Sequence, residues 1–268
     1  MNAVFKDKAI VAIVWIAGIV AVWELGAWSL VNVFHDTMAT QKLPYLHEII
    51  VVFINNFKSL LDSGLETLSK SALGFLYGAG IGFILAILMS LSRNIERIAF
   101  PYLIISQMIP ILGLAPIIYN IVRDADVSRI VIAAYITFFP VCINTLGGLR
   151  CVDKDKKDLM YSYAAKKHSV YMKLMLPSAL PSLFAGLKIA APLSVTAAIL
   201  VEMLGTDEGI GVKILYTLYY GAGGATMFWA SVITSALLGI LGYFVVTLAE
   251  RILIPWQHAA MKRVGGDE

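Results

Sequence analysis

Long apolar segments alternate with short polar ones along the whole chain, and this pattern defines the predicted elements. A helix needs about 20 largely apolar residues to cross a hydrocarbon core about 30 Å thick. Six segments meet this requirement, so the pattern predicts an all-α membrane protein with six transmembrane helices. The predicted spans lie near residues 9–34, 67–91, 98–122, 128–149, 183–204 and 227–254.

Small residues and prolines add detail to these spans. Gly74, Gly78 and Gly82 share one face of the second span, at the spacing that lets helix backbones approach closely. We interpret this glycine ladder as a packing feature. Other spans contain prolines whose freed backbone groups neighbouring helices can satisfy. These prolines are Pro101, Pro110, Pro116, Pro140 and Pro192.

Composition supports the membrane interpretation. Hydrophobic residues make up 59% of the chain, charged residues only 15%, and the mean hydropathy is +0.79, whereas soluble domains contain about 25% charged residues. A chain of 268 residues with this many spans leaves little room for a separate soluble catalytic domain. Cys142 and Cys151 show no paired metal-ligand spacing, so we expect neither a disulfide framework nor a thiolate metal site.

The placement of basic residues predicts the orientation. With both termini in the cytoplasm, the cytoplasmic set is Lys6, Lys8, Arg93, Arg97, Arg150, Lys154, Lys156, Lys157, Lys166, Lys167, Lys173, Arg251, Lys262 and Arg263. The external set is Lys42, Lys58, Arg123, Arg129 and Lys213. The cytoplasmic set is much the larger, as the positive-inside rule requires. The segment 158–181, between the fourth and fifth spans, therefore lies on the cytoplasmic face.

This segment is basic and prone to form helix. No glycine or proline occurs from Lys157 to Leu176, and apolar residues recur there at helical spacings, so we expect one or two short amphipathic helices. Pro177 and Pro181 are expected to end the pattern before the fifth span begins. Three interpretations remain open from the physics alone: a loop that fixes topology, a helix on anionic lipid headgroups, and a docking element for a partner.

This segment contains an acidic residue, then a small residue, then a Leu-Pro pair, separated by characteristic spacings. The stretch resembles the cytoplasmic signature of bacterial ABC importer permeases, E-A-A-x-x-x-G followed after nine residues by I-x-L-P. Aspartate replaces glutamate, methionine replaces the second alanine, and alanine replaces glycine. The positions that correspond are Asp158, Leu159 and Met160, then Ala164, Leu174, and Leu176 with Pro177.

Further stretches resemble the subfamily that imports sulfonates, taurine, nitrate and vitamin precursors. Residues 160–166 resemble its A-R-S-Y-G-A-S, and 179–181 with 185–188 resemble A-L-P followed by G-L-R/K. Residues 201–205 with 209–211 resemble A-E-M-L-G followed by G-L-G, and 250–256 resemble its E-R/K ending with a tryptophan. Together these matches cover roughly residues 66 to 256.

The resemblance implies a transport subunit in the bacterial inner membrane. Its partners would be ABC ATPase subunits, a second permease copy, an extracytoplasmic solute-binding protein and the lipid bilayer, and no nucleic acid. A coupling helix at 162–172, between the fourth and fifth spans, would contact the ATPase. The coupling residues implied are Asp158, Ser162, Tyr163, Ala164, Ala165, Lys166, His168, Tyr171 and Pro177.

The chain has no phosphate-binding loop, and no Gly-Lys dipeptide occurs in it. We therefore expect ATP and Mg to bind the partner ATPase, with no cofactor on this chain and no enzyme activity in it. The domain organisation expected is a first transmembrane helix and external segment at 1–65, a permease domain at 66–256, and a cytoplasmic tail at 257–268.

The alternative is an ion- or proton-coupled secondary transporter, which would need ionisable residues inside several spans. Only Glu24, Lys188 and Glu202 are predicted at membrane depth, and each lies near a span end where it could extend to the interface. Lys70 follows Glu66 by four residues and is expected to form a helix ion pair with it.

Polar residues inside the spans are the candidates for a substrate pathway, although each could instead form an interhelical hydrogen bond. Small sulfonates, nitrate-like anions, pyrimidine vitamin precursors and riboflavin all remain possible substrates. The candidate pathway residues are Gln107, Thr137, Asn144, Ser194 and Thr196.

Overall fold

The computed structural model describes residues 2–35, 37–220 and 224–256, and all regular structure in these ranges is helical. The all-α prediction is confirmed. The predicted tail, 257–268, lies outside the described residues. The helices are α1 (Asn2–Asn32), α2 (Ala39–Lys42), α3 (Leu46–Asn55), α4 (Phe57–Leu91), α5 (Arg93–Met108), α6 (Ile111–Val122), α7 (Ala125–Arg150), α8 (Lys154–Ser162), α9 (Lys167–Val170), the π-helix η1 (Tyr171–Met175), α10 (Leu176–Glu202), α11 (Ile210–Tyr220) and α12 (Gly224–Leu253).

Five helices of the described residues are long and apolar enough to cross a membrane. They are part of α1 (Ile13–Asn32), α4, α7, the continuous segment Lys167–Glu202, and α12. The number reaches six only if α5 and α6 together count as one broken span.

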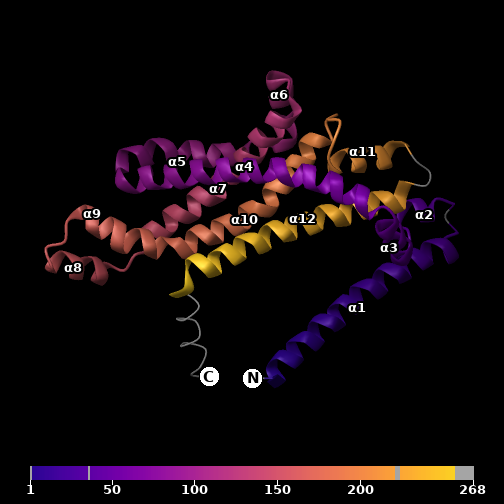
Figure 1. The fold of residues 1–268 in the computed structure, drawn as a ribbon, viewed down its shortest axis with the longest axis horizontal. Helices are drawn as coiled ribbons and strands as arrows, with labels where there is room; N and C mark the ends of the chain where they lie inside the picture. The colour runs from indigo at the N-terminus through magenta and orange to yellow at the C-terminus, as the bar shows by residue number, and fades with distance from the viewer. Residues whose placement is uncertain (1, 36, 221–223, 257–268) are drawn as a thin grey trace.

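The third predicted span, 98–122, is wrong as a straight helix. The chain leaves the helix at Ile109 and Pro110, and α5 and α6 meet at 98°. Pro110 has no backbone N–H and disfavours helical geometry at Ile109, so the break is expected locally. Pro110 also leaves the Ser106 carbonyl without its helical donor, and the hydroxyl of Tyr135 donates to that oxygen at 2.5 Å. As a result α6 stands out from the bundle (Figure 1).

The centre of the bundle is formed by α4, α7 and α10, with α12 lying along α10 (Figure 1). The glycine ladder faces α7, because a Cβ at Gly74 would lie 2.7 Å from the Ile130 carbonyl and one at Gly78 would lie 2.5 Å from that of Ala134. Such distances exclude any side chain there, so the two backbones approach directly. The predicted packing role of the ladder is confirmed.

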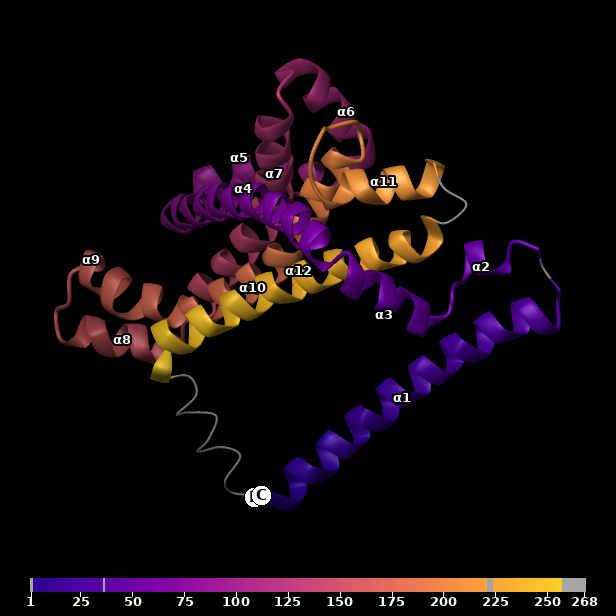
Figure 2. The same ribbon diagram turned by 45° about the vertical axis from the view of Figure 1, so that its right-hand side comes forward.

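Helix α1 lies apart from this centre along most of its length (Figures 1 and 2). Its attachment is near its C-terminal end, where the Trp23 indole donates to the Pro44 carbonyl at 3.0 Å and the Glu24 carboxylate accepts from the Leu46 N–H at 3.1 Å. The Trp23 ring also packs edge-on against Trp229 of α12, with the two ring centroids 4.7 Å apart. Glu24 therefore caps α3 at the start of that helix.

The expectation that Pro177 and Pro181 end a helix is wrong. Both lie inside a helical segment that runs without a break from Lys167 to Glu202. Pro177 falls in the first turn of α10, directly after the π-helix η1, so the hydrogen bond that its missing N–H cannot make would have been to a carbonyl of η1. The preceding π-helix takes up the local misfit, since the Leu176 N–H bonds the Tyr171 carbonyl one residue further back than in an α-helix.

This segment has 36 residues, which at 1.5 Å per residue gives a rod of about 54 Å. The hydrocarbon core is only about 30 Å thick. A rod of this length cannot lie wholly within the hydrocarbon core unless it is strongly tilted, and its first turn is α9.

Candidate functional site

The predicted coupling segment forms a helix, a turn and a second helix. The carboxylate of Asp153 caps α8 by accepting from the Asp155 N–H at 3.0 Å. Helix α8 ends at Ser162, the chain turns through 163–166, and α9 starts the long rod at Lys167. Two short helices agree with the prediction, but the stretch 162–172 is not one rigid helix, because the turn lies inside it.

The backbone at Ala164 explains the turn. Its φ is +52°, a left-handed conformation that favours glycine. The N–H of Ala164 bonds the Tyr161 carbonyl at 2.9 Å, and the N–H of Ala165 bonds the Met160 carbonyl at 3.1 Å. This pair of bonds is a Schellman motif, which commonly ends helices with glycine at the left-handed position. The position where the family signature has glycine is thus the one where a helix C-terminus needs it.

Apolar and basic side chains surround this turn and are exposed. Tyr163 is 79% exposed and Leu159 58%. Lys166, Lys167 and His168 are exposed as well. The turn forms one extreme end of the molecule (Figure 1), so nothing in the described chain covers it. We name residues 163–166 the α8–α9 turn.

Two interactions tie the segments before and after the α8–α9 turn to the bundle. The hydroxyls of Tyr171 and Ser90 lie 2.7 Å apart, which joins η1 to the end of α4. Arg150, the last residue of α7, forms an ion pair with Glu96 of α5. Tyr171 is therefore placed to anchor the turn, while Asp158 and Ser162 lie on the exposed α8 and Pro177 lies in the rod.

A buried group of charges lies at the opposite end of the rod. Glu202, the last residue of α10, is fully buried, and Arg129 of α7 is only 3% exposed. They form an ion pair at 3.2 Å. The Glu202 carboxylate also accepts hydrogen bonds from the Thr67 hydroxyl at 2.9 Å and the Gly211 N–H at 2.8 Å. It therefore links α4, α7, α10 and α11. We name Thr67, Arg129, Glu202 and Gly211 the ion-pair cluster.

Further charges surround Arg129. Its guanidinium pairs with Asp126 and lies 3.5 Å from Glu66. Lys70 pairs with Asp126 at 2.6 Å and with Glu66 at 3.6 Å. The predicted pair of Lys70 and Glu66 is confirmed as part of this larger network.

Two assignments from the sequence are wrong here. Arg129 is not an external loop residue, because α7 begins at Ala125 and carries Arg129 one turn into the bundle. Glu202 does not extend to an interface, because α11 and the segment 203–209 fold back over it. Lys188 is also paired within the protein, with Glu250 of α12 at 2.5 Å. The helical spacing of Asp126 and Arg129 was the available signal, but it cannot predict a partner 73 residues away.

Lys213 of the short helix α11 forms a hydrogen bond to α4. Its amine donates to the Ser59 carbonyl at 2.7 Å. Burial lowers the pKa of Lys213, and the negative charge of Asp62 partly opposes that shift. This contact adds a second tie between α11 and α4.

The five predicted pathway residues are not brought together. Thr137 is fully buried between α4 and α7, and its hydroxyl donates to the Ala133 carbonyl at 2.8 Å. The Asn144 amide donates to the Pro140 carbonyl at 2.7 Å. Gln107 is exposed near the end of α5. Both hydrogen bonds of the Thr137 hydroxyl stay within α7, so this residue packs against α4 without forming an interhelical hydrogen bond.

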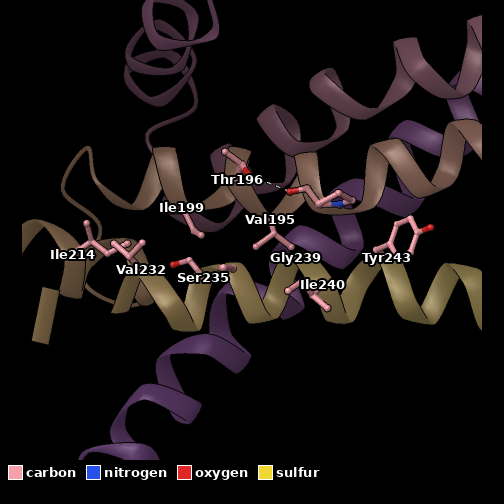
Figure 3. A pocket seen from close by; sticks show the side chains of 11 residues that line it. Val195, Thr196, Ile199, Ile214, Val232, Ser235, Gly239, Ile240 and Tyr243 are labelled. Carbon is pink, nitrogen blue, oxygen red and sulfur yellow. Dashed lines mark hydrogen bonds between the residues drawn. The ribbon is translucent and has the colours of Figure 1, made fainter. Parts of the chain in front are cut away.

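Ser194 and Thr196 of α10 line two different cavities. Thr196 faces a cavity of about 560 Å³ between α10, α11 and α12 (Figure 3), and its hydroxyl donates to the Pro192 carbonyl at 3.1 Å. Ser194 lines a smaller cavity of about 240 Å³ between α4, α10 and α12. Apart from Thr196, the hydroxyls of Ser235 and Tyr243 are the polar side-chain groups of the larger cavity, which is otherwise apolar.

Residues 78–257 match the family model described as the binding-protein-dependent transport system inner membrane component. The chain belongs to this family. The match covers the α8–α9 turn and, in the ion-pair cluster, Arg129, Glu202 and Gly211. The α8–α9 turn of this permease therefore lies inside the matched region, and so does the ion-pair cluster except for Thr67.

Curated relatives extend the similarity over most of the permease. The formylaminopyrimidine transport permease protein ThiX of Halalkalibacterium halodurans is 32% identical, over 89% of this chain and 92% of the relative. The putative aliphatic sulfonates transport permease protein SsuC of Bacillus subtilis is 30% identical, over 78% and 77%. The nitrate import permease protein NrtB of Synechococcus elongatus is 28% identical, over 70% and 67%.

Two solved structures share the fold of the permease. A chain of an amino acid ABC transporter aligns with a TM-score of 0.62 at 16% identity, covering 75% of this chain and 97% of its own. A chain of the MetNI methionine ABC transporter in an inward-facing conformation aligns at 0.55 and 20% identity, covering 73% and 94%. The multi-pass helical bundle is thus that of an ABC importer permease.

Proposed function

We propose that this permease is driven by a separate ATPase subunit that docks against the α8–α9 turn. The observation that carries the proposal is the exposed tyrosine at the tip of the turn, with Leu159 and the basic Lys166 beside it. A contiguous exposed apolar patch rimmed by polar residues marks a protein interaction site, and Leu159 and Tyr163, one helical turn apart, would form such a patch. A loop that served only to fix topology would need the charges but not the aromatic side chain.

The orientation belongs to the same proposal: both termini and the α8–α9 turn lie on the cytoplasmic side of the inner membrane. In support, the turn and the C-terminal end of α12 lie at the same end of the bundle (Figure 1). A cysteine at Lys167 should label only from the cytoplasm and one at Lys213 only from outside. Labelling of position 167 from outside would contradict the docking proposal.

The assembly proposed has two permease copies, two ATPases and an extracytoplasmic solute-binding protein. A single chain offers half of a symmetric pathway, and closed two-fold dimers are the commonest oligomers. ATP and Mg would then be bound by the ATPase partner and not by this chain. Native mass measurement should give two permeases with two ATPases, and a transport-competent single copy would contradict the proposal.

For the substrate, we favour a pyrimidine vitamin precursor over a sulfonate, nitrate-like anion or riboflavin. The similarity to a formylaminopyrimidine permease covers most of both chains. The largely apolar cavity beside Thr196, with three hydroxyl groups, suits a flat ring with few polar substituents better than a compact anion. Uptake competition between formylaminopyrimidine and an alkyl sulfonate in cells carrying the complete importer should favour the pyrimidine.

Docking is tested with a matched pair of variants. Tyr163→Ala removes the exposed ring of the turn, and Tyr219→Ala removes a ring that is 71% exposed at the other end of the bundle. Co-purified ATPase should fall at least tenfold in the first variant, about 1.4 kcal/mol of binding, and stay unchanged in the second. Equal recovery of ATPase with both variants would contradict docking at the turn.

The same importer discriminates the alternative of an ion- or proton-coupled transporter. Uptake should stop when the ATPase partner is inactivated and should persist when a protonophore collapses the proton gradient in ATP-loaded proteoliposomes. The opposite result would support the secondary transporter.

A further inference from the structure

Helices α7 and α10, which lead to and from the helices around the α8–α9 turn, are held together at the ends that lie far from the turn. Helix α7 leads into α8, and the rod Lys167–Glu202 leads out of α9. Arg129 lies in the second turn of α7 and Glu202 is the last residue of α10, so their ion pair joins the ends most distant from the turn. Helices α7 and α10 thus form a hairpin that is closed at both ends.

Close packing makes this hairpin one body along its length. A Cβ on Gly186 of α10 would lie 2.7 Å from the Pro140 carbonyl of α7. A Cβ on Gly148 of α7 would lie 2.7 Å from the Ser182 Cβ. Direct backbone contact of this kind resists sliding, because any shift moves a side chain into a helix backbone.

The ion-pair cluster also fixes the segment that follows α10. Gly209 has a φ of +117°, and a Cβ there would collide with the Glu202 carboxylate. The Arg129 guanidinium reaches the Glu208 carbonyl at 3.4 Å, and the Ile210 N–H bonds the Thr67 hydroxyl at 3.0 Å. The segment 203–209 is therefore seated on the ion pair.

Charge burial of this kind is poor evidence for stability alone, because apolar residues of similar volume often replace a buried ion pair without loss. The arrangement even leaves the Arg129 Nε buried with no hydrogen-bond partner in the described part of the chain. What an ion pair with several directed hydrogen bonds does supply is a single register between helices.

We infer that Arg129 and Glu202 are positioning residues for transport: they make α7 and α10 move as one body, so that a movement at the α8–α9 turn also displaces the segment 203–209. The inference rests on the proposed docking of an ATPase at that turn. Transmission needs no hinge in the hairpin, since the rod is continuous and its far end is fixed to α7.

The first test measures coupling in the complete importer reconstituted in proteoliposomes. Glu202→Gln keeps an acceptor for Thr67 and Gly211 but removes the charge opposite Arg129. Substrate transported per ATP hydrolysed should fall about fivefold or more, the lower range for coupling between distant sites, at an equal amount of assembled complex. A merely structural role would lower the amount of complex and leave this ratio unchanged.

A matched control uses the other buried ion pair of α10. Glu250→Gln removes the charge opposite Lys188 and leaves α7 untouched. Its ratio of transport to hydrolysis should change less than about twofold, below the range for such coupling. An equal fall in both variants, or no fall in Glu202→Gln, would overturn the inference.

The second test keeps the ion pair intact and so does not depend on a variant that folds poorly. Cysteines at Val127 of α7 and Leu204 after α10, both exposed, would be joined by a bismaleimide in a Cys151→Ser background. If the hairpin moves as one body, the crosslinked importer keeps its transport rate. Loss of transport on crosslinking would show that α7 and α10 separate during the cycle and would overturn the inference.

These outcomes are distinct from failure of the proposed function. If ATPase binding does not depend on Tyr163, the docking proposal fails, whatever the ion pair does. If the ATPase docks and the ratio in Glu202→Gln equals that of the unmodified importer, only the positioning role fails.

Discussion

The two ends of the α7–α10 hairpin differ in how far their side chains are exposed. At one end Tyr163 is 79% exposed, and at the other Glu202 has no exposed surface. The first end leaves its side chains without partners in the described chain, whereas the second uses its carboxylate in three interactions with other helices. The buried end holds helices of this protein together, whereas the exposed end has the accessibility that the proposed docking of an ATPase requires.

The same contrast appears in the backbone. Both ends contain left-handed residues, Ala164 at one and Gly209 at the other. Ala164 lies in open surroundings and tolerates a Cβ at some local strain. Gly209 has no such freedom, because the Glu202 carboxylate occupies the place of a Cβ. A side chain is therefore tolerated at the exposed left-handed position and excluded at the buried one.

The largest effect should come from removing the buried charge. Glu202→Ala leaves Arg129 without its closest buried partner, and breaking a buried pair costs about 3–5 kcal/mol. Thermal unfolding in detergent should show this loss, while Tyr163→Ala should stay within about 0.5 kcal/mol of the unmodified protein. A double replacement, Arg129→Met with Glu202→Leu, should recover only part of the stability, because it removes the unpaired charge but leaves the buried Gly211 N–H without its acceptor. A loss below 1 kcal/mol in Glu202→Ala would remove the contrast between the two ends.

A glycine pair sharpens the comparison at the buried end. Gly205 and Gly209 have similar φ values, +110° and +117°, but a Cβ on Gly205 would meet nothing within 4 Å. Both alanine variants bear the backbone strain, and only Gly209→Ala also crowds Glu202. The free energy of unfolding of Gly209→Ala should therefore be about 1–3 kcal/mol lower than that of Gly205→Ala, because overpacking usually costs this much. Equal stability would mean that the Glu202 side chain moves aside easily.

At the exposed end, a change of opposite sign is expected. Ala164→Gly relieves a left-handed alanine, which costs about 1–2 kcal/mol, but adds flexibility to the unfolded chain worth about 0.5–1 kcal/mol. The net effect on the free energy of unfolding should be a stabilisation of between about 0 and 1.5 kcal/mol. Ala164→Trp instead keeps the strain and adds bulk at the docking surface, so ATPase recovery should collapse in that variant. Normal recovery with tryptophan would argue for a lipid-facing loop.

The smallest effect belongs to the charges beside the turn. Exposed charges contribute about 0–1 kcal/mol, so Lys166→Gln with Lys167→Gln should leave ATPase binding and uptake largely intact. Quantitative pull-down of the ATPase checks this. Loss of correct topology in the double variant, with ATPase binding retained by Ala164→Trp, would show that the basic residues fix orientation and that the turn does not dock.

Several features could be predicted because neighbouring residues determine them. The all-α membrane class follows from segment length, and the glycine ladder indicates close packing without a known partner helix. The turn inside the coupling segment was missed, although the glycine position of the family signature, held here by Ala164, was the available signal. The break in the third span was also missed, although Pro110 marks its position.

The sequence by itself determined the membrane environment, the class of fold and the position of the exposed segment, because hydrophobic length and helical spacing are properties of consecutive residues. Only the tertiary structure decided that Arg129 and Glu202 meet, that α10 continues through Pro177, and that Thr137 is buried against α4. Each of these depends on which helices lie side by side. Burial and ion pairing are properties of that arrangement, so residues far apart in the chain acquire them only when the bundle has formed.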